Sequence, residues 1–247
     1  MLFLRIAFTI WAYLTFFLLM LIAFVYHIVV AIITLGRGVD LMYKCYRPWA
    51  VTWAFLNGVR LDIRGEEHIE KNRSYVFVMN HGSTADIVIV AAAMKNRYRP
   101  LGKKELVRLP VMGFMFRKAL ILVDRSNPES RRQSMERMRE IIGKNISVLI
   151  APEGTRNRTP EPLQPFKDGA FRLAIECQLP VIPMVLLNTR RLYPNDEWLL
   201  HHCPLGCHFL EPVSTEGLKE KDIPELKEKV HTLMKEHIVK HDILYSG

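Results

Sequence analysis

A long apolar run opens the chain. Residues 6–35 carry no full charge, and only four polar side chains interrupt them: Thr9, Thr15, His27 and Thr34. As a helix, these 30 residues would extend about 45 Å, whereas the hydrocarbon core of a bilayer is about 30 Å thick. A cleaved signal peptide has a much shorter apolar region, roughly 7–15 residues. The run therefore predicts a membrane helix that tilts, extends into the lipid interface, or lies in one leaflet beside a partner helix.

Residues 41–56 are the candidate partner helix. They carry many aromatic side chains, which suit a lipid interface: Tyr43, Tyr46, Trp49, Trp53 and Phe55. Only the basic residue Arg5 precedes the apolar run. Five basic residues follow it: Arg37, Lys44, Arg47, Arg60 and Arg64. By the positive-inside rule, we expect residues 1–58 to anchor the chain to the inner (cytoplasmic) membrane, with the remainder facing the cytoplasm.

Beyond Gly58, short apolar runs alternate with amphipathic stretches. Strands are predicted at residues 59–64, 75–79, 119–123, 147–151 and 181–187. Asn127-Pro128 is typical of a helix N-cap followed by proline at the first helical position, and that helix would end at Gly143. A second amphipathic helix is indicated near the C-terminus by Leu226, Val230, Leu233 and Ile238. This alternation predicts one α/β domain over residues 59–247.

The charge balance and the cysteines narrow the choice of partners and compartment. A formal net charge of +9 suits nucleic acid, an anionic lipid surface or an acidic substrate. The basic residues are scattered and form no long run, so we do not expect a nucleic-acid partner. Four cysteines without the spacing of a secreted disulfide framework indicate a reducing compartment: Cys45, Cys177, Cys203 and Cys207.

The candidate catalytic pair is His81 and Asp86. His81 follows a predicted strand, and Asp86 comes after a turn that contains Gly82. The carboxylate could fold back onto one ring nitrogen, fix the tautomer of the imidazole and leave the other nitrogen to take a proton. Ser83-x-x-Asp86 is also a capping-box pattern, which requires no catalysis. Because the sequence has no Gly-x-Ser-x-Gly elbow, a histidine that activates a hydroxyl of the substrate is favoured.

Two further motifs follow other strands. One is Glu153-Gly154-Thr155-Arg156, with Lys167 further along, and it combines a permissive glycine with phosphate-binding side chains. The other runs from Lys104 through bulky apolar residues towards Arg125. The cationic residue at the start of this second motif could bind a lipid headgroup, and the apolar residues that follow could contact an acyl chain. The alternatives are an ordinary turn with solvated charges for the first, and a core helix with a solvated end for the second.

A third cluster has zinc-like ligand types without the pattern of a zinc site. His201, His202, Cys203, Cys207 and His208 lie within eight residues. Structural zinc sites usually join two separated pairs of ligands, and no second pair lies near. We therefore predict a loop that leads into a strand at residues 207–210, and no metal.

Taken together, the motifs resemble the glycerolipid acyltransferase family over roughly residues 59–215. Four blocks occur in the family's order: Asn80-His81-x-Ser83-x-x-Asp86, Lys104 to Gly113 with Arg125, Glu153 to Arg156 with Pro165-Phe166-Lys167, and Leu179 to Pro183. The chain departs from the family pattern at Ala119, Leu122 and Asn157, where glycine, phenylalanine and serine are common. These departures bear on acceptor or acyl preference more than on reaction type.

The resemblance implies an α/β fold with a mixed sheet flanked by helices. It also implies transfer of an acyl group from acyl-carrier protein or acyl-CoA to the sn-2 hydroxyl of lysophosphatidic acid, which gives phosphatidic acid. His81 would be the general base and Asp86 would orient it. The implied glycerol phosphate site comprises Lys104, Arg125, Glu153, Gly154, Thr155, Arg156 and Lys167. No cofactor is implied beyond the acyl thioester, and the partners are membrane lipids and the acyl carrier.

Three other functions remain open from the sequence. The acceptor could be another lysolipid or glycerol 3-phosphate, or the protein could bind lipid at a membrane without catalysis. A membrane-tethered hydrolase could use water at the same base.

Overall fold

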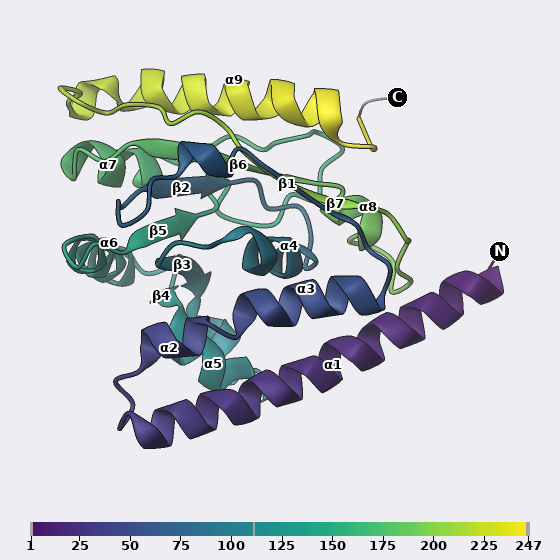
Figure 1. Cartoon of the computed structure of the whole chain (residues 1–247). Helices are drawn as coiled ribbons and strands as arrows, with labels where there is room; N and C mark the ends of the chain where they lie inside the picture. The colour runs from purple at the N-terminus through teal and green to yellow at the C-terminus, as the bar shows by residue number, and fades with distance from the viewer. Residues whose placement is uncertain (1, 111, 246–247) are drawn as a thin grey trace.

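The apolar run folds as one long helix at the edge of the molecule. The computed structural model describes residues 2–110 and 112–245. Helix α1 (Leu2–Ile33) lies along the base of the molecule and extends past it at the N-terminus (Figure 1). It is long and apolar enough to cross a membrane, and only 17% of its most apolar window is buried. A core helix of a soluble protein would be mostly buried, so the exposed apolar surface of α1 favours contact with lipid.

The polar residues of α1 face the protein. Thr9, Thr15 and His27 are buried, and Nε2 of His27 lies 2.9 Å from the hydroxyl oxygen of Tyr46. The Asn57 amide donates to Oγ1 of Thr15 at 3.0 Å. Thr15 and His27 thus bond to the partner segment, whereas Oγ1 of Thr9 accepts from the Leu200 amide at 3.0 Å. The exposed side of α1 is mainly apolar.

The predicted partner helix is present but broken. It consists of α2 (Val39–Tyr43) and α3 (Tyr46–Leu56), with a turn at Lys44 and Cys45. Helix α3 packs between α1 and α4 (Asp86–Ala93), and Trp53 belongs to the same core as the sheet residue Phe77. The core therefore runs across the proposed boundary at residue 58, and the division into domains stays a prediction.

A seven-stranded mixed sheet forms the centre of the molecule. In spatial order the strands are β1 (Leu61–Arg64), β7 (Leu205–Phe209), β6 (Val181–Leu187), β2 (Val76–Met79), β5 (Ser147–Ile150), β3 (Tyr98–Lys103) and β4 (Ile121–Val123). Strands β2 to β6 are mutually parallel, whereas β7 is antiparallel to β6 and pairs in parallel with β1. The predicted mixed α/β sheet is confirmed.

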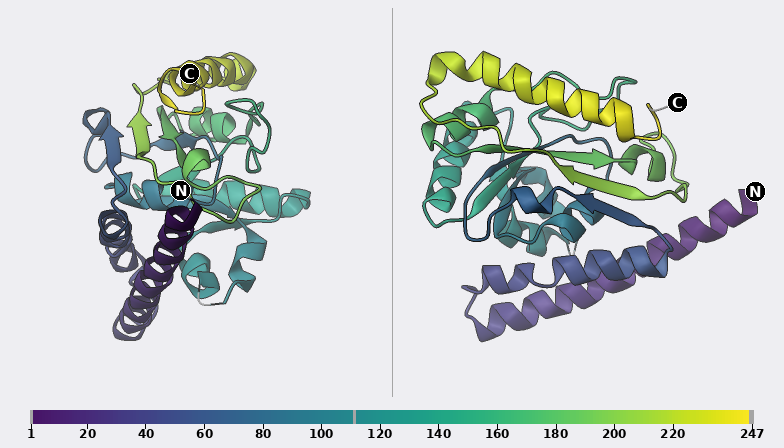
Figure 2. Two further views of the ribbon diagram at one scale, coloured as in Figure 1. Left: turned by 90° about the vertical axis from the view of Figure 1, so that its right-hand side faces the viewer. Right: turned by 45° about the horizontal axis from the view of Figure 1, so that its top comes forward.

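Helices cover both faces of the sheet (Figures 1 and 2). Phe77 packs into the core shared with α3 and α4, whereas Val76 and Val78 pack into the opposite core. This alternation is the two-residue period of a strand. The helices of the second core are α6 (Pro128–Ile142), α7 (Gly169–Glu176) and α9 (Ile223–His241).

The predicted elements are largely present. Asn127 caps α6, and its side chain accepts hydrogen bonds from the backbone amides of Glu129 and Ser130. The predicted strand at 119–123 begins later, because Ala119 ends α5 (Met112–Ala119). Strand β3 was not predicted, since its sequence contains Arg99, Pro100 and Gly102 in place of an apolar alternation.

Three histidines join the end of α9 to strand β7. Nδ1 of His208 lies 2.7 Å from Nε2 of His237, and the ring centroids of His237 and His241 are 4.4 Å apart. Nε2 of His208 lies 3.3 Å from a carboxylate oxygen of Asp62. Burial and the neighbouring His241 lower the pKa of His237 to about 4, and burial also lowers the pKa of His208.

This cluster predicts a loss of stability in acid. Because the folded pKa of His237 lies below its unfolded value of about 6.5, the unfolded state binds more protons between these values, so the free energy of unfolding falls as pH falls from about 6.5 towards 4. His237→Gln should flatten this dependence in denaturant unfolding at a series of pH values. His68→Gln, a half-buried histidine outside this cluster, is the control, and equal pH slopes for both variants would contradict the prediction.

Candidate functional site

The predicted site residues gather at one edge of the sheet. His81 follows β2, and Glu153 and Arg156 follow β5. Lys104 follows β3, and Arg125 follows β4. Because these strands are parallel, their carboxyl ends meet at the same edge, where open α/β sheets bind ligands.

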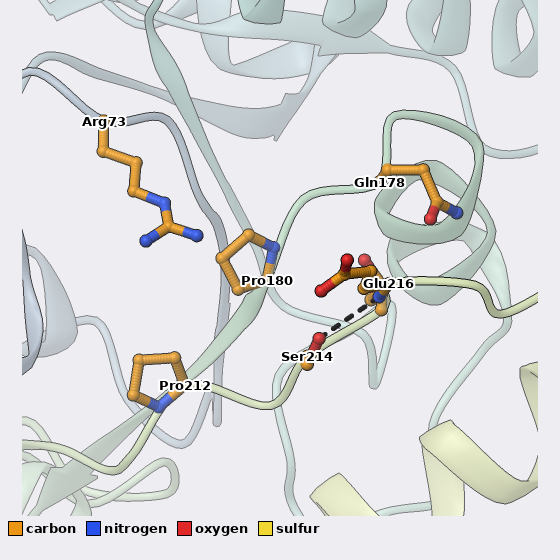
Figure 3. Close-up of a pocket in the computed structure, with 7 residues that line it drawn as sticks. Arg73, Gln178, Pro180, Pro212, Ser214 and Glu216 are labelled. Carbon is orange, nitrogen blue, oxygen red and sulfur yellow. Dashed lines mark hydrogen bonds between the residues drawn. The ribbon is translucent and has the colours of Figure 1, made fainter.

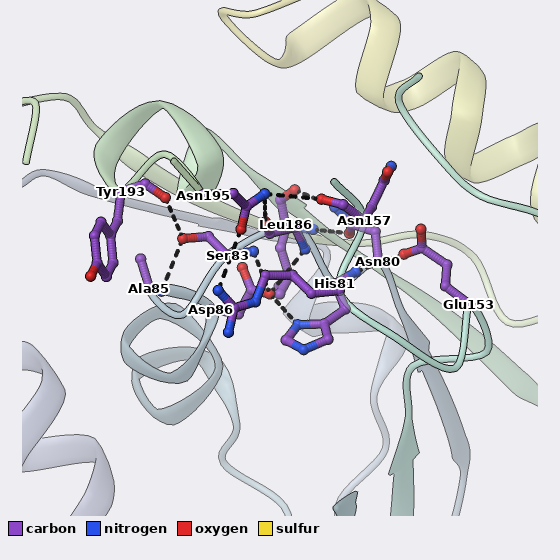
Figure 4. A network of polar contacts seen from close by, with 12 residues as sticks. Asn80, His81, Ser83, Ala85, Asp86, Glu153, Asn157, Leu186, Tyr193 and Asn195 are labelled. Atoms are coloured by element: carbon purple, nitrogen blue, oxygen red, sulfur yellow. Dashed lines mark hydrogen bonds and ion pairs between the residues drawn. The ribbon is translucent and has the colours of Figure 1, made fainter. Parts of the chain in front are cut away.

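The His81–Asp86 pair is formed. Nδ1 of His81 lies 2.6 Å from Oδ2 of Asp86, and the amides of Gly82 and Ser83 donate to the same oxygen at 3.1 and 3.2 Å. Asp86 is 2% exposed, whereas the His81 side chain is 32% exposed. The carboxylate is thus fixed in the interior, and no bond is drawn to the other ring nitrogen of His81 in Figure 4.

The capping box suggested by Ser83 and Asp86 is only partly formed. Helix α4 begins at Asp86 itself, and no side chain caps it. The Ser83 hydroxyl donates to the Tyr193 carbonyl at 2.7 Å and accepts from the Ala85 amide at 3.2 Å. The Asp86 carboxylate does accept from the Ser83 amide, as in a capping box, but it binds His81 at the same time.

Asn80 joins the loop after β2 (residues 80–85) to the neighbouring strand β6. Its side chain donates to the Leu186 carbonyl at 2.8 Å and accepts from the Leu186 amide at 2.7 Å. These two bonds take the place of backbone hydrogen bonds between β2 and β6 at the point where β2 ends. Sequence analysis did not assign this role, and its position next to His81 was the only available signal.

Glu153 clamps two loops together. One carboxylate oxygen accepts from the His81 amide at 2.8 Å, and the other accepts from the Gln164 amide at 2.9 Å. The residue is 3% exposed, and burial raises the pKa of its carboxyl. Its side chain is therefore directed at the protein backbone, and its predicted contact with substrate stays a prediction.

Asn157, where the chain departs from the family pattern, organises the loop after β5. Its amide donates to the His81 carbonyl at 2.7 Å. Its side-chain oxygen accepts from the Thr159 amide at 2.9 Å, and its side-chain nitrogen donates to the Glu161 carbonyl at 2.8 Å. Together with Glu153, it holds the backbone of His81 on both sides (Figure 4).

The predicted phosphate-binding side chains fall into two groups. In the first, Arg125 donates to the Gly154 carbonyl, and the Lys167 side chain packs over Gly154, where an added Cβ would lie 2.8 Å from Nζ of Lys167. Lys104 pairs with Asp124 beside Arg125, and this pairing helps to lower the pKa of Asp124 to about 2.

The second group lies closer to His81. Nη1 of Arg156 donates to Oδ1 of Asn195 at 3.4 Å, and Asn195 also donates to the Gly82 carbonyl at 3.2 Å. Nε of Arg156 is buried and has no hydrogen-bond partner among the described residues. Thr155 between these groups is exposed. Arg156 therefore has one unpaired cationic donor close to the loop that follows β2.

The histidine- and cysteine-rich segment is dispersed. Nε2 of His202 lies 3.0 Å from the Gly58 carbonyl oxygen, whereas Cys207 and His208 belong to β7. Within residues 2–110 and 112–245, no group of three or more His, Cys, Asp or Glu side chains is placed to hold a metal ion. The predicted strand is present as β7.

A surface depression lies away from this site. It has a volume of about 410 Å³ and is lined by Arg73, Gln178, Pro180 and the segment from Pro212 to Glu216 (Figure 3). Arg73 and Pro180 precede β2 and β6, so the depression lies at the amino ends of these strands, opposite His81.

Comparison with known proteins identifies similar sequences over most of the chain. Residues 60–187 match the protein family described as Acyltransferase. The 1-acyl-sn-glycerol-3-phosphate acyltransferase alpha of Bos taurus is 32% identical over 201 residues, which cover 81% of this chain and 69% of that protein. A 1-acyl-sn-glycerol-3-phosphate acyltransferase of Limnanthes douglasii is 32% identical over 73% of this chain and 63% of its own length.

One solved structure is similar throughout. The crystal structure of the 1-acyl-sn-glycerophosphate (LPA) acyltransferase PlsC from Thermotoga maritima aligns with a TM-score of 0.67 and covers 92% of this chain and 95% of that protein. At 22% identity, this similarity establishes a common fold.

The clamp by Glu153 predicts a measurable loss of stability. In Glu153→Gln the single amide oxygen can serve only one of the two backbone amides, and the other would face an NH₂ group. A buried donor left unpaired costs about 1–3 kcal/mol. Denaturant unfolding should show a loss of this size, whereas Glu161→Gln, an exposed carboxylate in the same loop, should change little. Equal stabilities would show that the clamp contributes nothing.

Proposed function

Because the chain belongs to the acyltransferase family, we propose that it acylates the sn-2 hydroxyl of 1-acyl-glycerol-3-phosphate and produces phosphatidic acid. The observation that carries this proposal is the His81–Asp86 pair, in which Asp86 binds one nitrogen of a partly exposed imidazole near the unpaired Nε of Arg156. The names of the similar proteins support lysophosphatidic acid as the acceptor.

The chemistry follows from the orientation of the imidazole. Asp86 holds the proton on Nδ1 of His81, so Nε2 is an acceptor. In the proposed step, Nε2 removes the proton from the lysolipid hydroxyl as its oxygen attacks the thioester carbonyl. The tetrahedral intermediate then collapses, the C–S bond breaks, and the imidazolium returns the proton to the leaving thiolate. A positioned base contributes about 10²–10⁴-fold, so orientation must supply much of the remainder.

The glycerol phosphate would lie between the catalytic loop and the loop after β5. Arg156 carries an unpaired buried Nε next to Asn195, and guanidinium groups bind phosphate through two parallel hydrogen bonds. Lys104, Arg125 and Lys167 would add positive charge from the adjacent group, and Gly154 and Thr155 would contribute the intervening backbone. The acyl donor in this proposal is acyl-carrier protein or acyl-CoA, and no cofactor or metal takes part.

Helix α1 supports a location at the membrane. Its exposed side chains are apolar along most of its length, and Trp198 and Phe55 add exposed aromatic surface. A site held at the interface avoids carrying an acyl chain through water, which costs about 0.8 kcal/mol per CH₂. With basic residues concentrated after the helix, we place the catalytic domain on the cytoplasmic side of the inner membrane.

Substitution of the catalytic pair tests the mechanism. His81→Ala should unfold at the wild-type denaturant concentration but lose at least about 10²–10⁴-fold in kcat. Asp86→Asn should also lose about 10²–10⁴-fold, because an amide no longer enforces the required tautomer. If Asp86 served only as a cap, the variant would instead lose about 0.5–2 kcal/mol of stability with turnover preserved.

Substitution of Arg156 tests the acceptor site. Arg156→Ala should raise the KM for the phosphorylated acceptor at least about tenfold, since a charge-assisted hydrogen bond contributes about 1.5–3 kcal/mol. The KM for the acyl donor should stay unchanged. Arg158→Ala, an exposed neighbour in the same loop, is the matched control. An unchanged acceptor KM for Arg156→Ala would remove this residue from the phosphate site.

Product analysis tests the function itself. Purified protein in lipid micelles is offered a labelled acyl donor, as CoA or carrier-protein thioester, with a panel of lysolipids and glycerol 3-phosphate. Phosphatidic acid identified by mass supports the proposal, and a different diacyl product would reassign the acceptor. Free fatty acid without an ester product would indicate a hydrolase, and lipid binding without turnover would indicate a non-catalytic protein.

A further inference from the structure

The end of the chain closes back on the loop that follows β6. Asp242 comes directly after α9 and is 5% exposed. Its Oδ2 accepts from the Asn188 amide at 2.7 Å, and the Ile243 amide donates to Oδ1 of Asn188 at 2.8 Å. Asn188 has a φ of 63° and directly precedes the short helix α8 (Thr189–Leu192). This reciprocal pair of bonds fixes the start of α8 against the chain end.

Arg190 extends from α8 to three separate segments. Its Nη1 donates to the Tyr245 hydroxyl at 2.8 Å, and its Nη2 donates to the Thr159 carbonyl at 2.8 Å. Its alkyl chain packs on Gly82, where an added Cβ would lie 2.7 Å from Cγ of Arg190. A single side chain thus joins the end of the protein, the loop after β5 and the catalytic loop.

These contacts lie close to His81. A small cavity of about 10 Å³ is lined by His81 and Glu153 from the site and by Arg190, Asp242 and Tyr245 from the chain end and α8. The guanidinium of Arg190 is engaged with the protein itself, in contrast to Arg156, whose Nε is unpaired among the described residues. Arg190 is therefore placed to support the site, and not to bind the substrate.

We propose that Arg190, bound to Tyr245 and carried by the short helix whose start Asp242 fixes, is a positioning residue that holds the loop after β5 and the His81 loop relative to each other during acyl transfer. The proposal rests on the proposed function. His81 must meet both the hydroxyl and the thioester, and displacement of a reacting group by about 1 Å can cost about 10²-fold in rate. Because neither Arg190 nor Tyr245 contacts the acceptor in this arrangement, their loss should lower kcat and leave KM unchanged.

The test uses the full-length protein and whichever acceptor the wild type esterifies. Arg190→Ala should lower kcat by about 10–100-fold. Tyr245→Phe removes the bond from Arg190 and the longer bond of 3.4 Å to the Glu161 carbonyl, and it should lower kcat by about threefold to tenfold. Arg190→Lys should restore part of the loss, because a lysine keeps the charge and alkyl chain but not the two-armed geometry. The exposed neighbour Arg191→Ala is the matched control and should retain wild-type kcat.

Amide hydrogen exchange supplies a readout that does not depend on the acceptor or on turnover. In Arg190→Ala and Tyr245→Phe, exchange should accelerate in residues 81–83 and 157–164, with the rest of the sheet unchanged. A higher acceptor KM with wild-type kcat in Arg190→Ala would make Arg190 a substrate ligand and overturn the proposal. Wild-type kcat and exchange in both variants would overturn it as well. Failure of the wild type to form phosphatidic acid would instead refute the proposed function.

Discussion

The buried carboxylate of Asp86 accepts three hydrogen bonds from the loop that follows β2, and the geometry of the site depends on this arrangement. One bond comes from the imidazole of His81, and two come from backbone amides of the same turn. The amides hold the carboxylate whether or not the imidazole is charged. The histidine is therefore oriented by a group that is itself immobile, which is how an orienting acid supports a general base.

The backbone of His81 is restrained as firmly as its side chain. Glu153 accepts from its amide, and the Asn157 amide donates to its carbonyl. Both partners come from the loop after β5, the segment that also carries Arg156. The proposed base and the proposed phosphate ligand are thus connected through a few hydrogen bonds, an arrangement that would hold a bound substrate in a fixed orientation to His81.

Helix α1, the proposed membrane helix, is joined to the domain through its polar side. Thr15 and His27 interrupt the apolar run in the sequence, and both are buried against residues of the 41–57 segment. The remaining surface of α1 is apolar and exposed. Helix α3 in turn packs on α4, the helix that starts at Asp86. The proposed lipid-facing element and the catalytic loop are consequently parts of one packed structure.

The sequence by itself determined the features that depend on local patterns. The apolar run, the cap at Asn127, the period-two strands and the fold-back from Asp86 to His81 all involve residues close together in the chain, where spacing alone dictates geometry. Strand β3 was not predicted because Pro100 and Gly102 interrupt the alternation of apolar residues. Its extended conformation depends on pairing with β4 and β5.

Only the tertiary structure decided how distant segments meet. Glu153 was predicted to bind substrate, yet its carboxylate accepts hydrogen bonds from the backbone amides of His81 and Gln164, which lie 72 and 11 positions away in the chain. Arg190 and Tyr245 carried no recognisable motif, since their meeting depends on α9 crossing the sheet and returning the chain end to β6. Hydrogen bonds over such separations depend on how the whole sheet and its helices pack, which no local pattern of residue types encodes.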